Sequence, residues 1–167
     1  MSGGALNVIS AEPDATLAGI AGRCASTHAV SSLPELYQLL DGPQRDRVSA
    51  LNLLGHSTRG HHYLRIGGTA IDMLDPGVAR FFERLAASGV LQRRGITALR
   101  LLGCETAVEI AGQRTIARLA HVLGVAVYGT RKPLLKAHYD RRGFDPTFAG
   151  LLVEAGELPR PRRRLES

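Results

Sequence analysis

The chain has 167 residues, of which 44% are hydrophobic and 22% are charged, a composition that indicates one globular domain and excludes a largely disordered protein. The formal net charge is +6, but the basic residues are scattered, and no strip of interleaved basic and aromatic residues is present, so we expect no nucleic-acid partner. Two cysteines, no charged-then-apolar leader and no apolar run near about 18 residues predict a cytoplasmic protein with free thiols and no membrane partner.

Four short apolar runs rich in branched residues predict buried strands, because a parallel strand buried on both faces carries a nearly continuous hydrophobic sequence. These runs are residues 5–10, 50–55, 98–103 and 125–130.

Segments with apolar residues three and four apart lie between these runs and predict helices at 14–25, 32–42, 75–89 and 112–124. Asp14 and Ser32 stand where N-caps are expected, and the last three segments end at glycine. Strands that alternate with helices of this length predict an α/β domain, with a mostly parallel sheet and helices on both faces.

Two further segments differ from this alternation. The pattern of residues 63–72 around Gly67-Gly68 predicts a hairpin on the rim of the sheet. Residues 132–146 are polar and irregular, and 147–156 are expected to form a helix. We expect a single domain over residues 1–158, followed by a basic, disordered tail at 159–167.

The runs at 50–55 and 98–103 both end in glycine followed by a chemically active side chain, His56 after Gly55 and Cys104 after Gly103. Ligands of open α/β sheets bind beyond the carboxyl ends of the strands, so both side chains lie on one rim if their strands are neighbours. A nearby imidazole favours the thiolate, which is the nucleophilic form of cysteine. The pattern predicts a Cys-His catalytic dyad; the alternative is that both residues only pack, as many strand-end cysteines do.

An apolar block ending in His, followed about 50 residues later by one ending in Cys, resembles the caspase-like (clan CD) cysteine peptidases. That superfamily includes metacaspases, gingipains, clostripain, separase, CHAT domains and the self-cleaving domains of large bacterial toxins. The segment "LLGCETA" is closest to the Cys block of bacterial CHAT-like domains, and 112–130 is similar to the helix and strand that follow it there. The resemblance covers roughly residues 48–130 and implies a caspase-like three-layer sandwich.

The resemblance implies that Cys104 is the nucleophile and His56 the general base. The backbone N–H of Cys104, with one near Ser57, would then donate hydrogen bonds to the oxyanion. Gly55 and Gly103 give the backbone room to turn and a substrate room to approach. The family usually has glycine directly after the His, whereas the side chain of Ser57 would crowd the substrate carbonyl or require a different turn.

Four acidic or polar residues are candidates for orienting His56 or contacting the substrate. Glu105 and Thr106 follow Cys104 where the cleft wall of a family member would lie. Glu105 could orient the imidazole or select a basic side chain of the substrate, and Asp72 or Asp75 could do the same.

Other reactive side chains carry weaker expectations. His61 is a candidate substrate contact and Arg131 a candidate site for an acidic group, with surface exposure as the alternative for both. Adjacent histidines such as His61 and His62 point to opposite faces in an extended chain, so no metal and no cofactor are expected. Cys24 lies in a predicted helix, where packing is expected.

We therefore expect a cysteine endopeptidase that hydrolyses peptide bonds through a thioester acyl-enzyme intermediate. The alternative is a catalytically inactive caspase-like module that binds a peptide or a partner protein. A protein or peptide substrate is the expected partner in the first case, with an activating partner or a homodimer as further expectations.

Overall fold

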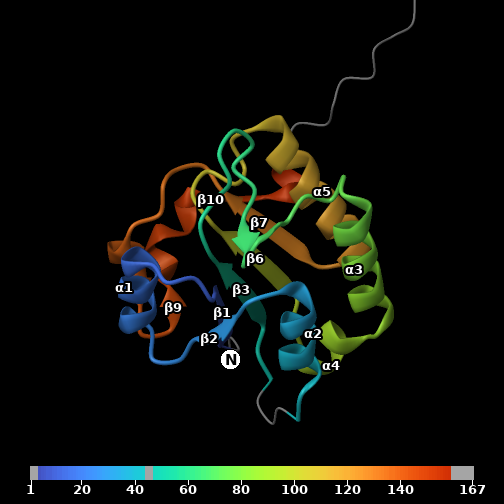
Figure 1. Cartoon of the computed structure of the whole chain (residues 1–167), viewed down its shortest axis with the longest axis horizontal. Helices are drawn as coiled ribbons and strands as arrows, with labels where there is room; N and C mark the ends of the chain where they lie inside the picture. The colour runs from blue at the N-terminus through green and yellow to red at the C-terminus, as the bar shows by residue number, and fades with distance from the viewer. Residues whose placement is uncertain (1–3, 44–46, 159–167) are drawn as a thin grey trace, which may run out of the picture.

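The computed structural model describes residues 4–43 and 47–158, and the expected tail at 159–167 lies outside them. A six-stranded sheet forms the centre, in the order β10-β7-β6-β3-β1-β2 (Figure 1). Its strands are β1 (Ala5–Ser10), β2 (His28–Val30), β3 (Ala50–Leu54), β6 (Ala98–Leu102), β7 (Ala126–Thr130) and β10 (Leu152–Glu154). All neighbours pair in parallel except β10, which is antiparallel to β7. The expected α/β class with a mostly parallel sheet is confirmed.

In the described residues five helices cover the sheet, and all but the shortest, α4 (Val90–Arg94), were expected at the places where they occur. The helices are α1 (Ala15–Arg23), α2 (Leu33–Asp41), α3 (Pro76–Ala87), α4 (Val90–Arg94) and α5 (Ile110–Leu123). Asp14 caps α1 by accepting the Leu17 N–H at 2.9 Å. The left-handed Gly124, at φ 65°, ends α5.

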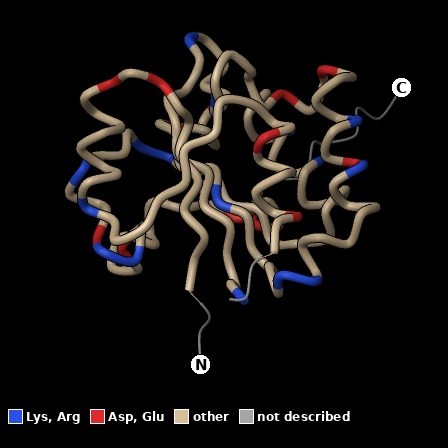
Figure 2. The backbone as a smooth tube through the Cα atoms, turned by 60° about the horizontal axis from the view of Figure 1, so that its bottom comes forward, with Lys and Arg blue, Asp and Glu red and all other residues tan. Residues whose placement is uncertain are grey.

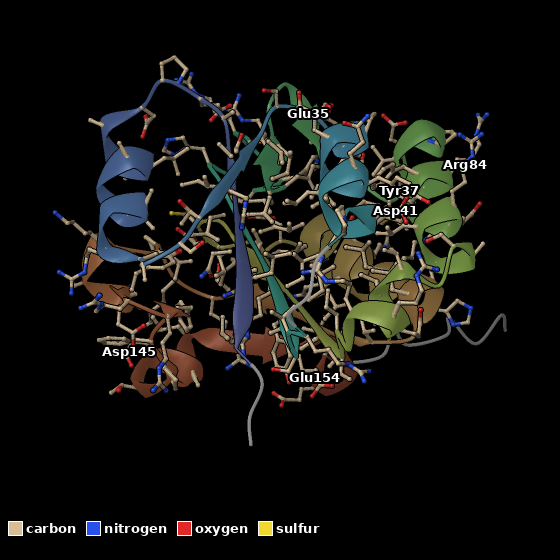
Figure 3. All side chains as sticks on the ribbon, turned by 90° about the horizontal axis from the view of Figure 1, so that it is seen from below. Glu35, Tyr37, Asp41, Arg84, Asp145 and Glu154 are labelled. Atoms are coloured by element: carbon tan, nitrogen blue, oxygen red, sulfur yellow. The ribbon has the colours of Figure 1, made fainter. Side chains whose placement is uncertain are left out.

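The two faces of the sheet are covered differently. The larger core packs α2, α3 and α5 against one face, and Leu51, Leu53 and Leu99 are among its sheet residues. A smaller core packs α1 and the segment around Tyr139 against Ile9, Leu54 and Leu102 on the other face. Figures 1 and 3 show this arrangement, with α1 on one side of the sheet and α2 and α3 on the other. The expectation of helices on both faces is confirmed.

The C-terminal part of the domain departs from the expected pattern, and the predicted helix at 147–156 is wrong. A 3-10 segment (Pro146–Leu151) leads instead into β10, and a second one (Ala155–Glu157) follows it. Val153 is 1% exposed in β10, and pairing with β7 satisfies backbone groups that β7 would otherwise leave unpaired at the edge of the sheet. Tertiary pairing therefore outweighs the helical spacing of this segment.

Short elements complete the fold. The hairpin expected at residues 63–72 is confirmed as β4 (Arg65–Ile66) and β5 (Thr69–Ala70). The region expected to be irregular contains a 3-10 turn (Lys136–His138) and a second hairpin, β8 (Tyr139–Asp140) with β9 (Gly143–Phe144).

The surface carries mixed charge. Figure 2 shows lysine and arginine distributed around the molecule, with acidic residues among them. Within the described ranges, no helix has the length and apolar character needed to cross a membrane.

Candidate active site

His56 and Cys104 follow two strands that are direct neighbours. Strands β3 and β6 pair in register, with Ala50 opposite Ala98 and Leu54 opposite Leu102. The chain leaves both strands at the same level through a single glycine. The two side chains consequently lie on one rim of the sheet and line the same pocket.

The glycines before His56 and Cys104 allow neighbouring groups to come very close. A Cβ atom at Gly55 would collide with the carbonyl oxygen of Arg65 on the adjacent hairpin, so no other residue fits without a backbone shift. A Cβ atom at Gly103 would lie 2.7 Å from the Ser57 Oγ. The loops that carry His56 and Cys104 are therefore packed directly against each other.

Two buried threonines hold the loop that carries Cys104. Thr130, at the end of β7, donates its hydroxyl hydrogen to the Gly103 carbonyl at 2.5 Å. Its own N–H donates to the Thr106 hydroxyl oxygen at 2.9 Å, while the Thr106 hydroxyl donates to the Leu101 carbonyl at 3.1 Å. Thr106 and Thr130 are 2% and 0% exposed, so this network fixes the backbone on both sides of the cysteine.

His56 has an acidic partner that the sequence analysis did not anticipate. The His56 Nε2 lies 3.0 Å from the Asp14 Oδ2. The other carboxylate oxygen, Oδ1, caps α1, so one residue anchors a helix and the imidazole together. Because a carboxylate only accepts hydrogen bonds, Nε2 carries the hydrogen and Nδ1 is left as the basic nitrogen.

The hydrogen bonds to Asp14 also change its acidity. The Leu17 N–H at the start of α1 and then the His56 side chain lower the pKa of the Asp14 carboxyl below its usual value of 3.8. Asp14 is therefore ionised throughout the neutral range, which suits a group that orients an imidazole.

Cys104 is half-buried in a narrow pocket of about 30 Å³. Its Sγ accepts a hydrogen bond from the Leu134 N–H at 3.4 Å. No hydrogen bond joins this sulfur to the His56 imidazole in the structure, although both residues line the pocket. Catalytic contacts are often long before substrate binds, and here the sulfur is turned to the segment after β7.

Two backbone N–H groups beside the reactive side chains form no hydrogen bond among the described residues. Ser57 pairs with Leu64 in an isolated bridge, whose two hydrogen bonds run from Arg65 N–H to His56 O and from Thr58 N–H to Tyr63 O. The Ser57 N–H takes no part in that bridge. Within the described ranges, neither this N–H nor that of Cys104 has a hydrogen-bond acceptor.

The Ser57 side chain explains how a residue other than glycine is accommodated after the histidine. Its hydroxyl turns to the neighbouring loop and donates to the Cys104 carbonyl at 2.7 Å. The hydroxyl thus crosslinks the two loops that carry the reactive side chains.

The other candidate residues lie outside the pocket lining. Thr106 is buried, and its hydroxyl is used in the threonine network, so its side chain is not presented to a substrate. Glu105 is half-buried and has a left-handed backbone, with φ 58°, which turns the chain sharply after Cys104. His61 and Arg131 are exposed, as surface residues would be.

The acidic residues considered as partners of His56 have other roles. Asp75 is the N-cap of α3 and accepts the Gly77 N–H at 2.9 Å. Asp72 accepts the Leu74 N–H at 2.9 Å. Asp14 was expected only as a helix cap, because no short-range pattern indicates that the start of α1 lies beside the end of β3.

Two more features of the pocket were not anticipated. Leu134 and Tyr139 both line it, and both come from the segment expected to be irregular.

Among the described residues, no group of three or more side chains that could hold a metal ion is present. In the comparisons with known proteins, no family model and no curated protein matches the chain.

Proposed function

We propose that the chain is a cysteine endopeptidase of the caspase-like superfamily, in which Cys104 is the nucleophile, His56 the general base and Asp14 the residue that orients the imidazole. One observation carries this proposal: His56 and Cys104 follow adjacent, registered parallel strands and line one pocket, and the Asp14 carboxylate lies 3.0 Å from Nε2 of the imidazole. Three groups in this order are the arrangement in which a nucleophile is activated by a base that a third group holds.

The reaction follows from these positions. Nδ1 of His56 takes the thiol proton, and the thiolate attacks the substrate carbonyl carbon, forming a C–S bond. The tetrahedral oxyanion accepts hydrogen bonds from the backbone N–H groups of Ser57 and Cys104. The C–N bond breaks as the imidazolium returns its proton to the leaving amine. Water, deprotonated by the same imidazole, then hydrolyses the thioester to a carboxylic acid and the free thiol.

The caspase-like three-layer sandwich belongs to this proposal as well. Its support is the six-stranded sheet with five parallel strands, α1 on one face and α2, α3 and α5 on the other. The reactive residues follow β3 and β6, which are central in this sheet.

The test uses covalent capture and proteolysis, with the second cysteine as the matched control. The parent protein, Cys104→Ala and Cys24→Ala are incubated with a set of peptidyl acyloxymethyl ketones and, separately, with denatured casein. We expect labelling and cleavage in the parent and in Cys24→Ala, and neither in Cys104→Ala. Cleavage that persists in Cys104→Ala would show that another group is responsible.

A second function is favoured by a specific observation. The Sγ of Cys104 accepts a hydrogen bond from the Leu134 N–H and forms none with the His56 imidazole, and the pocket is narrow. These features suit a module that binds a peptide or a partner protein without cleaving it. Failure of every peptidyl probe to label Cys104, in a protein that still binds a peptide at this rim, would favour the binding module.

A further inference from the structure

Tyr139 is a buried residue that lines the pocket containing His56 and Cys104. It is the first residue of β8 and is 1% exposed, within the smaller core. No residue of the described part of the chain forms a hydrogen bond with its hydroxyl. The hydroxyl oxygen is not one of the fully buried atoms that lack a partner, so it keeps access to water, which the small pocket beside the ring can hold.

The ring lies against the same pocket as the reactive side chains. Tyr139, His56, Cys104 and Thr16 are the lining residues with polar side chains, and the other lining residues are apolar or glycine. The pocket volume of about 30 Å³ is enough for one or two water molecules, since about 10–15 Å³ by this measure holds one.

The position of Tyr139 is fixed by contacts on three sides. Arg23, at the end of α1, donates its Nε hydrogen to the Tyr139 carbonyl at 2.9 Å. The backbone of Tyr139 pairs with Phe144 in the hairpin, and their rings meet edge to face with centroids 5.9 Å apart. The phenol is thus held in place, as a preorganised donor must be.

The electrostatic environment keeps this hydroxyl protonated. Burial raises the pKa of Tyr139, and the negative charges that Cys104 and Cys24 would carry as thiolates raise it further. The Tyr139 hydroxyl therefore stays protonated in the pH range in which a cysteine thiol loses its proton. Towards a thiolate it acts only as a hydrogen-bond donor.

We propose that Tyr139 stabilises the Cys104 thiolate by donating a hydrogen bond to it across the pocket, through one water molecule. This inference rests on the proposed function, because it concerns the same nucleophile. The Leu134 N–H, 3.4 Å from the sulfur, supplies a second donor from the opposite end of the same segment. Two neutral donors beside the sulfur favour the charged form of the thiol.

The experiment measures how fast iodoacetamide labels Cys104 as a function of pH, in a Cys24→Ser background, so that a single thiol reacts. The variants are Tyr139→Phe, His56→Ala, Thr16→Val and Tyr128→Phe, the last a half-buried tyrosine of β7 that does not line the pocket. We expect Tyr139→Phe to move the midpoint of labelling upward by about one pH unit, which slows labelling below the midpoint about tenfold. Thr16→Val and Tyr128→Phe should leave the midpoint unchanged.

The outcomes separate this inference from the proposed function. If His56→Ala shifts the midpoint and Tyr139→Phe does not, the role of Tyr139 is refuted while the dyad stands. If the parent labels like an ordinary free thiol and ignores His56→Ala, the proposed function fails, and this inference fails with it. Thermal unfolding serves as the folding control, because a hydroxyl without a partner can be removed without loss of stability. A marked drop for Tyr139→Phe would mean that the hydroxyl has a structural role, and would also overturn the inference.

Discussion

The Ser57 hydroxyl donates a hydrogen bond of 2.7 Å to the backbone carbonyl of Cys104, and so joins the ends of the two central strands. A glycine after His56 would have no side chain to form this hydrogen bond. The Ser57 hydroxyl also lies close to Gly103, where a Cβ atom would come too near to it. The geometry of the cysteine loop therefore depends on a side chain from the histidine loop.

Replacing Ser57 by alanine should loosen this connection. The free energy of unfolding is expected to fall by about 1 kcal/mol, which is typical of one lost hydrogen bond, and iodoacetamide labelling of Cys104 should change. Ser88→Ala is the matched control, because the Ser88 hydroxyl also donates to a backbone carbonyl, that of Leu85 at 2.6 Å, at the end of α3. An equal change of Cys104 labelling in Ser88→Ala would show that the effect is not local.

The buried pair of threonines should matter more for stability. Thr130→Val removes the hydroxyl that donates to the Gly103 carbonyl and leaves that carbonyl unpaired in the core, so we expect a loss of about 1–3 kcal/mol in chemical denaturation. Thr97→Val is the control, since the Thr97 hydroxyl donates to the Ser49 carbonyl in an exposed position. A Thr130→Val protein as stable as the parent would contradict the assigned network.

Asp14 should make the free energy of unfolding depend on pH in the acid range. The Leu17 N–H, and then His56, lower the folded-state pKa of Asp14 below 3.8. The ionised carboxylate therefore stabilises the fold fully above pH 3.8. The contribution is lost as the pH falls from 3.8 through the folded-state pKa. The difference in unfolding free energy between the parent and Asp14→Ala should therefore shrink over this range.

Two comparison variants separate the roles of Asp14. Asp14→Asn retains an acceptor for the cap of α1 but loses the charge beside His56, and should slow any Cys104-dependent cleavage. Asp145→Ala removes a similar cap at a 3-10 segment, where Asp145 accepts the Thr147 N–H at 2.9 Å (labelled in Figure 3). If Asp145→Ala impaired cleavage as strongly as Asp14→Asn, the orienting role of Asp14 would be wrong.

Tyr139 should lower the free energy of unfolding at alkaline pH. Because burial raises its pKa above the ordinary 10.0, the unfolded chain loses the phenol proton first as the pH rises through 10.0. Stability should then decline with increasing pH in the parent and decline less in Tyr139→Phe. Urea titrations on both sides of this pH measure the difference, and parallel decline in both proteins would contradict the buried environment.

The strand and helix pattern was readable from the chain because it depends on local sequence. Runs such as 50–55 and 98–103 must be apolar to be buried on both faces, and Asp14 and Ser32 cap their helices by contacts within three residues. The prediction failed at 147–156, where pairing of β10 with β7 decides the structure.

Sequence alone therefore determined the α/β class and the positions of His56 and Cys104 at strand ends, since both follow from hydrophobic periodicity and the glycines that end it. The tertiary structure decided which groups surround those two residues. Asp14, Ser57, and the pair Leu134 and Tyr139 reach the site from three separate segments, and their contacts depend on strand order and loop packing, to which no periodic pattern in the chain corresponds.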